Sequence, residues 1–444
     1  MPTLIEQARS NKPAAASILP RAIWPLLVGL AIGALMFYVI GPGMGDYPSK
    51  IVLIAGINII LAVSLTVVNG FTGQFSMGHA GFMAVGGYVA ATITYYGSMK
   101  LFGSADPAGG VLSFTGGADK PTALARWGDA LFIGSCLMGG VGAAIAGYIV
   151  GLPSLRLRGD YLAIVTLGFG EIVRVLLQGT HEQIQPWRVE DALAKPVYEL
   201  AISLGGPKGF QLLPTYTTLF WVYLFVVVTL IICYRVKNSS TGRAFLSIRE
   251  DEIAAQAMGV DITKYKVRAF VLAAFFAGVA GGLYAMDIGA INAGDLGFLK
   301  SFDIIIMVVL GGMGSISGAA LAAIILTILP ELLRNPPPVW PVGLVLIALI
   351  AGVSSYRKRF RWKPIIVIAI ASTLLEVGRQ IALSKGINVA DFRLILYALL
   401  LITMMLVRPQ GIFGIHEIWE ILPGYARREA ARNGARGGSQ GGKP

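Results

Sequence analysis

The chain has 444 residues, of which 55% are hydrophobic and only 14% are charged. A soluble globular protein usually has about 25% charged residues, and a disordered chain is poor in apolar ones, so this composition excludes both classes. The formal net charge is +12, but the basic residues lie between apolar runs and form no nucleic-acid-binding surface. The composition predicts a polytopic membrane protein.

Apolar runs long enough to cross a membrane recur along the chain. A spanning helix needs about 20 mostly apolar residues. Clear candidates lie at 22–40, 51–70, 77–95, 130–152, 160–178, 217–235, 268–286 and 391–407. Three more are shorter or interrupted, at 318–333, 340–354 and 364–379, and 302–312 is too short to span without tilt or bilayer thinning. The predicted fold is an all-α, polytopic transmembrane helix bundle with about 10–12 membrane segments, counting broken or re-entrant ones.

The distribution of Lys and Arg predicts the orientation. If residues 1–21 lie in the cytoplasm and the segments alternate, the inside loops hold more than twice as many Lys and Arg residues as the outside loops. Both termini then face the cytoplasm. We expect a cytoplasmic N-terminal segment at 1–21, a transmembrane domain at 22–414 and a low-complexity cytoplasmic tail at 415–444.

A glycine-rich connection separates the segments 302–312 and 318–333. Its glycines are Gly311, Gly312, Gly314 and Gly318, and we expect the helical backbone to break there. Two interpretations stay open. Broken segments at membrane depth often line transport paths, whereas a tight turn between two helices has no such role.

Small residues also recur at helical spacing on two predicted spans. They share one face of 130–152 and one face of 268–286, where they are Gly139, Ala143, Gly147 and Gly151 in the first and Ala274, Gly278 and Gly282 in the second. Such faces let helix backbones approach closely. They predict tight packing and imply no substrate.

No pattern indicates catalysis. The three histidines are far apart, and His79 is expected to pack or cap at the entrance of a span. Cys136 and Cys233 lie inside apolar runs and suggest neither a disulfide nor a metal site. Gly437–Lys443 has phosphate-loop spacing but is followed by Pro444. We therefore expect a chain that is not an enzyme, with no catalytic residue, metal or cofactor.

Ionisable residues inside predicted spans need an explanation, because charge is costly in hydrocarbon. Glu171 and Arg174 are three residues apart on the segment 160–178, close enough to pair on one helix face. They form either an internal ion pair that fixes helix rotation or a polar lining of a permeation path. Asp287, Asp295 and Asp303 are expected to be solvated around an outer loop.

The cytoplasmic loop 239–266 carries the most informative pattern. Its apolar residues recur on one helical face, at Leu246, Ile253, Ala257 and Val260. Gly259 suits the left-handed position that ends a helix, and Asp261 suits the start of the next. The loop is expected to hold a short charged helix with an apolar stripe. That helix lies either on the lipid surface or in a groove of a cytoplasmic partner.

Several runs resemble known permeases. Glu252–Gly259 resembles the "EAA" loop of ABC-importer permeases, with Glu252, Ala254, Ala255 and Gly259 in the motif's positions and Arg249 and Glu250 just before it. Four other runs are similar to LivM-type permeases of branched-chain amino acid transporters, and they are Gly73–Phe82, Leu157–Ile172, Val309–Ser315 and Arg408–Gly414. The segment 335–390 departs from that family, because it inserts two apolar segments and a basic turn at Arg357–Lys363.

The resemblance implies a subunit of a larger machine in the bacterial inner (plasma) membrane. A LivH-like second permease completes the path, two cytoplasmic ABC ATPases dock on the loop 239–266, and an extracytoplasmic solute-binding protein delivers the substrate. Membrane lipids surround the chain, and no nucleic acid is involved. Urea, short-chain amides or other amino acids are alternative substrates. An ion-coupled secondary transporter is a weaker alternative, because such proteins usually contain internal repeats and unpaired carboxylates inside the membrane.

Overall fold

The computed structural model describes residues 28–36, 45–102, 128–154 and 160–334, together with single residues such as Gly411, Gly414 and Glu417. The predicted segments 1–21, 340–354 and 364–379, and most of 391–407 and of the tail, lie outside the described residues. The chain divides into two compact units, Met1–Ile324 with Gln410–Pro444 and Ile325–Pro409. All contacts discussed below belong to the first unit.

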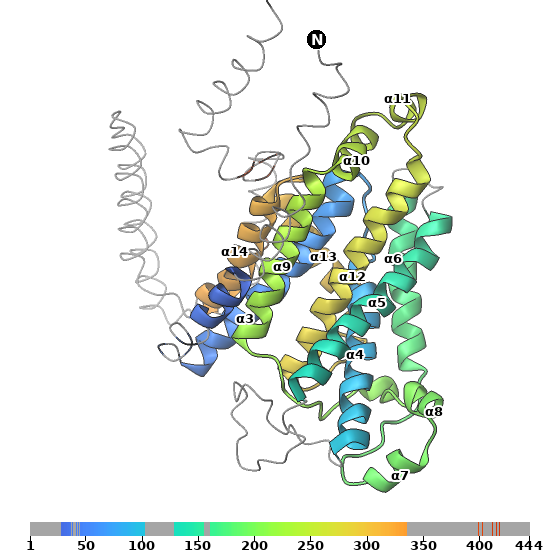
Figure 1. The fold of residues 1–444 in the computed structure, drawn as a ribbon, viewed down its shortest axis with the longest axis vertical. Coiled ribbons are helices and arrows are strands. Elements are labelled where there is room, and N and C mark those ends of the chain that lie inside the picture. The colour runs from blue at the N-terminus through green and yellow to red at the C-terminus, as the bar shows by residue number, and fades with distance from the viewer. Residues whose placement is uncertain are drawn as a thin grey trace, which may run out of the picture. The chain divides into compact units, whose positions relative to one another are not determined.

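Helices make up the secondary structure of the described residues, and no strand beyond an isolated bridge occurs among them (Figure 1). The long helices are α3 (Asp46–Leu65), continued by the π-helix η3 (Thr66–Phe71), α4 (His79–Phe102), α5 (Gly128–Ser154), α6 (Asp160–Gln178), α9 (Leu219–Lys237), α12 (Ile262–Ile288), α13 (Phe298–Gly311) and α14 (Ile316–Arg334). The short helices are α7 (Val189–Ala194), α8 (Val197–Ile202), α10 (Ser240–Glu250) and α11 (Glu252–Ala257). The predicted all-α class is confirmed.

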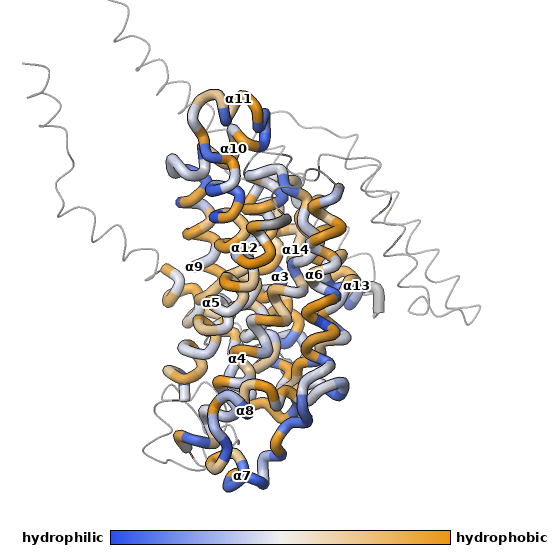
Figure 2. Tube along the Cα trace, turned by 90° about the vertical axis from the view of Figure 1, so that its right-hand side faces the viewer, coloured by the Kyte–Doolittle hydropathy of each residue, from blue (hydrophilic) through white to orange (hydrophobic). Residues whose placement is uncertain are grey.

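Five of the described helical stretches are long and apolar enough to cross a membrane. They are Asp46–Phe71, Gly128–Leu152, Tyr161–Gln178, Leu219–Lys237 and Ile262–Ile288, and they match five of the predicted spans. Hydrophilic residues gather at the α10–α11 end and at the α7–α8 end, and hydrophobic residues dominate between them (Figure 2). This banding fits a bundle whose two ends are in water and whose middle lies in lipid.

The core is built where α12 packs against α4 and α5 (Figure 1). A Cβ atom added at Gly278 would lie 2.5 Å from Cβ of Ala143 and 2.7 Å from the carbonyl oxygen of Gly139. A Cβ added at Gly86 on α4 would lie only 2.1 Å from Cα of Gly278. The small-residue faces predicted on 130–152 and 268–286 therefore do bring the helix backbones together, and larger residues there would overpack the core.

An irregular segment, 72–78, connects η3 to α4 inside the bundle. Its backbone donors are satisfied by side chains: the N–H of Ser76 donates to Oδ1 of Asn69 (3.1 Å), and that of Met77 to Oγ1 of Thr166 (3.0 Å). His79, the first residue of α4, is buried with its Nε2 2.9 Å from Oγ of Ser64. The packed role predicted for His79 is confirmed. Irregular backbone at this depth is tolerated because protein groups replace the missing helical hydrogen bonds.

Candidate functional site

The loop 239–266 folds as two short helices rather than one. Asp251 separates α10 from α11 with an extended backbone (φ −157°, ψ 112°), and its Oδ1 accepts hydrogen bonds from the N–H groups of Ile253 (2.8 Å) and Ala254 (3.1 Å). The prediction of a single helix with a continuous stripe was wrong, because Asp251 caps a new helix instead of continuing the old one.

The end of the loop follows the prediction. Gly259 has φ +84°, in the left-handed region that only glycine adopts without strain, and nothing lies within 4 Å of where its Cβ would be. Asp261 caps α12, since its Oδ1 accepts from the N–H of Lys264 (3.1 Å). The chain thus turns sharply from α11 into α12. The confirmed signals are both local, and local capping chemistry is what a sequence pattern reports best.

The tip of the loop exposes apolar side chains. Ile253 is 72% exposed and Met258 is 85% exposed, whereas Ala255 is buried against its own chain and Ala254 is exposed. Large apolar groups exposed at a hydrophilic end of the molecule make this tip a candidate surface for binding another protein. We call Ile253, Ala254 and Met258 the docking tip. Since Ala255 faces inward, its small size serves the packing of the loop.

Two contacts tie the docking tip to the membrane helices. The ammonium of Lys266 on α12 lies 2.5 Å from Oε1 of Glu252 on α11, and the Lys266 side chain is almost fully buried. The rings of Phe245 on α10 and Tyr265 on α12 meet edge to face, with centroids 6.2 Å apart. A buried, charge-assisted hydrogen bond is short and directional. These contacts therefore join α10 and α11 to α12.

Arg249 extends the connection to two other backbone segments. Its Nη1 donates to the carbonyl oxygen of Gly70 at the end of η3 (2.8 Å) and to that of Met313 (3.3 Å). The sequence placed Arg249 in the coupling loop but gave no sign of these partners, which are 179 and 64 residues away. The guanidinium joins α10 to two points where helices end.

The glycine connection forms a tight turn between α13 and α14. Gly312 and Gly314 have φ of +110° and +114°, and a Cβ at Gly311 would lie 2.4 Å from the carbonyl carbon of Gly318. The turn therefore needs glycine both for its backbone angles and for the close approach of the two helices. Of the two open interpretations, the geometry of the turn itself matches the tight turn. Its contacts with Arg249 place it at the end of the bundle that carries α10.

The side chain of Glu417 caps the N-terminus of α14, although the sequence analysis placed this residue in the tail. Its carboxylate accepts from the N–H groups of Ile316 (3.1 Å) and Ser317 (3.0 Å), and from Nζ of Lys237 (2.6 Å). The Glu417 side chain is 2% exposed. Burial raises the pKa of Glu417, but the hydrogen bonds from Lys237 and Ser317 outweigh it and hold that pKa below its usual range. No sequence signal links residues 180 positions apart.

Glu171 and Arg174 pair as predicted. Nε of Arg174 lies 2.6 Å from Oε2 of Glu171, and its Nη1 donates to Oε1 of Gln178 (3.2 Å). Both charged side chains are about one-third exposed. A Cβ added at Gly297, just before α13, would lie 3.4 Å from Oε1 of Glu171. The pair is thus internally satisfied and partly exposed, and the start of α13 lies against it.

The three aspartates predicted to be solvated do not share one environment. Asp295 is exposed in the loop before α13, as expected. The Asp287 side chain is nearly buried, with its Oδ1 4.0 Å from Nζ of Lys50, so the prediction was wrong for this residue. Asp303 is exposed but lies on the helix α13 and not in a loop. Packing of α12 against α3 covers Asp287, which the sequence could not indicate.

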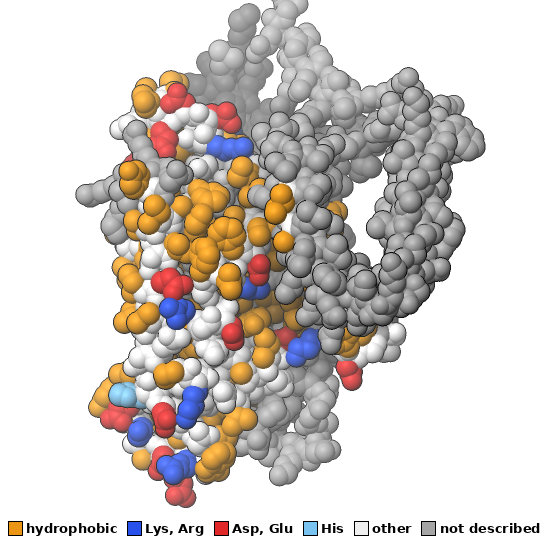
Figure 3. Space-filling view, turned by 180° about the vertical axis from the view of Figure 1, so that it is seen from behind, with side chains coloured by type: hydrophobic (Ala, Val, Ile, Leu, Met, Phe, Trp, Pro, Cys, Tyr) orange, Lys and Arg blue, Asp and Glu red, His pale blue; other side chains and the backbone are white. Residues whose placement is uncertain are grey.

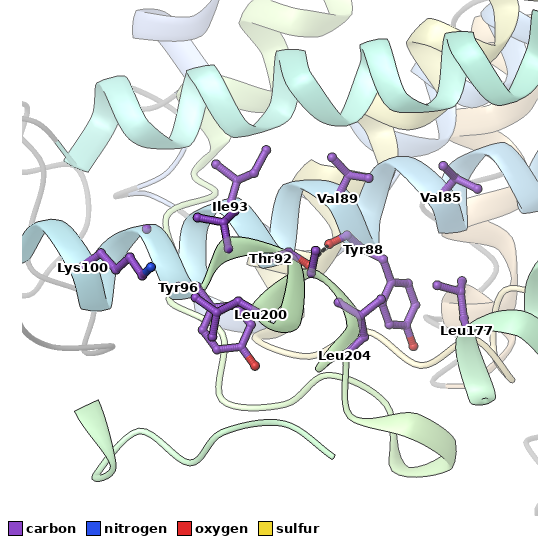
Figure 4. A pocket seen from close by; sticks show the side chains of 13 residues that line it. Val85, Tyr88, Val89, Thr92, Ile93, Tyr96, Lys100, Leu177, Leu200 and Leu204 are labelled. Atoms are coloured by element: carbon purple, nitrogen blue, oxygen red, sulfur yellow. Dashed lines mark hydrogen bonds between the residues drawn. The ribbon is translucent and has the colours of Figure 1, made fainter. Parts of the chain in front are cut away.

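An apolar cavity of about 480 Å³ lies beside α4, along the part from Val85 to Lys100 (Figure 4). Val85, Tyr88 and Val89 line one part of it, and Leu200 and Leu204 line another. The Tyr88 hydroxyl is already engaged, because it donates to the carbonyl oxygen of Ile291 (3.2 Å) and accepts from the N–H of Ala293 (3.0 Å). The lining offers little to recognise a charged solute, so we do not assign it as a substrate site.

In the described part of the chain no three His, Cys, Asp or Glu side chains lie together as metal ligands would. What the structure does present is a multi-pass helical bundle with a docking tip, an ion pair inside a span and a buried network around a glycine turn. Together these features define a polytopic helical membrane protein with an exposed apolar loop at one hydrophilic end.

Comparison with known proteins agrees with this class. Residues 47–353 match the family described as branched-chain amino acid transport system / permease component, and the chain belongs to this family. The chain is similar to LivM permease proteins of high-affinity branched-chain amino acid transport systems. It is 36% identical to the one from Escherichia coli and 35% identical to the one from Salmonella typhimurium, each over 296 residues, which is 63% of this chain. The match covers 62% of the length of these two relatives.

A third relative is of the LivH type. The probable LivH permease of Methanocaldococcus jannaschii is 26% identical over 286 residues, which is 64% of this chain and 78% of the relative. The chain therefore resembles both kinds of permease in this family. No solved structure matches it.

Proposed function

We propose that this chain is a permease subunit of an ATP-driven importer in the bacterial cytoplasmic membrane, and that it carries branched-chain amino acids inward. The observation that carries the proposal is the docking tip, which is exposed at its end yet connected through Glu252 to Lys266 of α12. LivM relatives, by their names, belong to branched-chain amino acid transport systems, and this supports the substrate class.

The energy source lies outside this chain in the proposal. An ATPase drives a permease only through contacts that differ between its nucleotide states, because equal contacts shift no equilibrium. The docking tip supplies such a contact. Two cytoplasmic ATPase subunits receive the tips of this chain and of a LivH-like second permease, and the chain itself carries no hydrolytic role. A solute-binding protein delivers the substrate at the opposite end of the bundle.

The test is co-expression of the chain with its second permease, ATPases and binding protein, followed by co-purification and uptake of labelled leucine. Replacing the docking tip by Ile253→Ser with Met258→Ser should release the ATPases and abolish uptake, because the apolar contact is lost. Gln256→Ser is the matched control, since Gln256 is exposed on the same helix but polar. Retained ATPases and normal uptake in the double variant would contradict the proposal.

The same assay decides the substrate. Competition by unlabelled isoleucine and valine is the expected result. If urea or short-chain amides compete and isoleucine and valine do not, the substrate is a urea or amide compound instead of a branched-chain amino acid. The proposal that the docking tip binds the ATPases is not affected by that result.

A further inference from the structure

Helix α13 carries charge at the middle of the membrane. Nζ of Lys300 lies 3.4 Å from Oδ1 of Asn58. Asn58 is near the centre of the 26-residue span Asp46–Phe71, 12 residues from its start. Asp303 precedes the end of α13 at Gly311 by eight residues, or about 12 Å along the helix. These two positions place Lys300 and Asp303 well inside the hydrocarbon region.

One face of α13 is not covered by the described chain. Leu299, Phe302 and Asp303 are all exposed, and their spacing of three and four residues puts them on the same side of the helix. The carboxylate of Asp303 accepts no hydrogen bond among the described residues. Its charge is attracted by Lys300, three residues earlier. We call Leu299, Phe302 and Asp303 the α13 face.

Lipid is a poor neighbour for the α13 face, since an exposed carboxylate at this depth costs several kcal/mol against acyl chains. The exposed surface of α5 is different in kind. It is wholly apolar along its length, with Leu137, Met138, Val141, Ile145, Tyr148 and Ile149 exposed. Figure 3 shows acidic and basic side chains among hydrophobic ones on one face of the molecule. The exposed surface of α5 is therefore suited to contact with lipid, whereas the α13 face needs water or a polar partner.

A second polar group lies on the same side of the bundle. The ion pair of Glu171 and Arg174 on α6 is partly exposed, and it borders Gly297 at the start of α13, where an added Cβ would lie 3.5 Å from Cδ of Arg174. This ion pair on α6 therefore lies beside the start of the helix that carries Lys300 and Asp303. Charges that gather on one face inside a membrane mark a solute path or a polar interface.

We propose that the α13 face lines the aqueous path for the amino acid, at the boundary with the second permease subunit, and that Asp303 contacts the substrate's ammonium group. This inference rests on the proposed function. Leu299 and Phe302 offer apolar surface for an aliphatic side chain, and the Asp303 carboxylate is a charge-assisted acceptor for an ammonium donor. Because the chain resembles both LivM and LivH permeases, the two subunits pair through corresponding faces, with the path between them.

Water access tests the path. The experiment uses the assembled transporter, with Cys136→Ala and Cys233→Ala to remove the two native thiols, and a membrane-impermeant, positively charged thiol reagent. Phe302→Cys is compared with Val141→Cys on α5, because the two native side chains are 41% and 42% exposed. We expect Phe302→Cys to react about tenfold or more faster, since thiolate forms in water and not in hydrocarbon. Leucine should slow the reaction.

Equal rates for the two variants would overturn the inference. So would a disulfide between Phe302→Cys and a second cysteine placed in 335–390, because the chain's own insertion would then cover the face. The accessibility measurement needs no transport. If the wild-type protein imports no branched-chain amino acid, the proposed function fails while the path assignment is still decided by the reaction rates.

The charge at Asp303 has its own test. Asp303→Asn should reduce leucine uptake about tenfold or more, because a hydrogen bond between two charged groups is lost, whereas Asp303→Glu should retain most of it. Co-purification of the ATPases shows that each variant is assembled. Wild-type uptake by Asp303→Asn, or equal loss in Asp303→Glu, would refute the ammonium contact.

Discussion

At the start of α14, the carboxylate of Glu417 accepts hydrogen bonds from backbone N–H groups that the helix itself leaves unpaired. A negative charge at a helix N-terminus is also favoured by the helix dipole. Lys237 supplies the opposite charge and donates as well to the carbonyl oxygen of Gly314 (2.9 Å). One side chain from a distant part of the sequence thus fixes both α14 and the end of α9.

Glu417→Gln should lower the stability of the folded protein by about 2 kcal/mol at neutral pH, because it removes the charge from this buried cluster. The pKa of Glu417 is held below its usual range, so the carboxylate stabilises the folded state at pH values above that range. The stabilisation disappears as the pH falls through the lowered pKa. Thermal unfolding of the detergent-solubilised protein at several pH values measures this difference.

Glu199→Gln is the control for that measurement. Glu199 is partly exposed and faces Lys195 at 4.0 Å, a surface pair that contributes little. Its replacement should leave the unfolding temperature unchanged. A Glu417→Gln protein that unfolds like the wild type at neutral pH would show that the buried cluster contributes nothing to stability.

Helix α10 acts as a connector, because its last turn contacts both η3 and the glycine turn through Arg249. Arg249→Ala should leave the ATPases bound, since the docking tip is unchanged. It should lower leucine uptake about tenfold or more, which is the usual size of a lost coupling energy. Co-purification and the number of leucine molecules imported per ATP hydrolysed are the measurements. Arg243→Ala, an exposed position on the same helix, should alter neither.

The turn between α13 and α14 depends on its glycines. Gly311→Leu should destabilise the protein by about 2 kcal/mol or more and reduce its yield, because an added side chain meets the backbone of Gly318. Unfolding in detergent and yield after purification test this. Gly134→Leu on α5 is the matched control, since nothing lies within 4 Å of its Cβ position. Equal stability of the two variants would mean that the turn can widen at no cost.

Elements that depend on near neighbours in the sequence were predicted well. The span 160–178 has the bounds of α6, the pair Glu171 and Arg174 needs only one helical turn, and the left-handed Gly259 follows from its place after a helix. The break at Asp251 was missed although its signal is local. Asp favours the start of a helix, and the hydrophobic spacing across it was given more weight than this capping preference.

Contacts between distant segments could not be predicted. The irregular segment 72–78 is stabilised by Thr166, and Glu417 by Lys237, and neither pairing leaves a trace in composition or periodicity. Asp303 was predicted to be solvated around an outer loop, and the structure places it, exposed, on the helix α13 instead. Its functional meaning depends on depth, which only the contact between Lys300 and Asn58 reveals.

Across the whole molecule, the two hydrophilic ends must lie on opposite sides of the membrane. The end with α10 and α11 carries more of the described Lys and Arg residues than the other end does, which predicts that it lies in the cytoplasm. The end with α7 and α8 is then expected to face outward. This arrangement puts the docking tip and the Arg249 contacts on the side where ATP is available.

Single cysteines at the two ends test this orientation in intact cells. In a background without Cys136 and Cys233, Trp187→Cys, in the loop before α7, should react with an impermeant thiol reagent added outside. Ala254→Cys, on the docking tip, should react only after the cells are made permeable. Both native side chains are exposed, so a difference in labelling reports the side of the membrane and not burial. Labelling of Ala254→Cys from outside would show that the protein has the opposite orientation in the membrane. The docking tip would then face the compartment that lacks ATP, and it could not engage an ATPase.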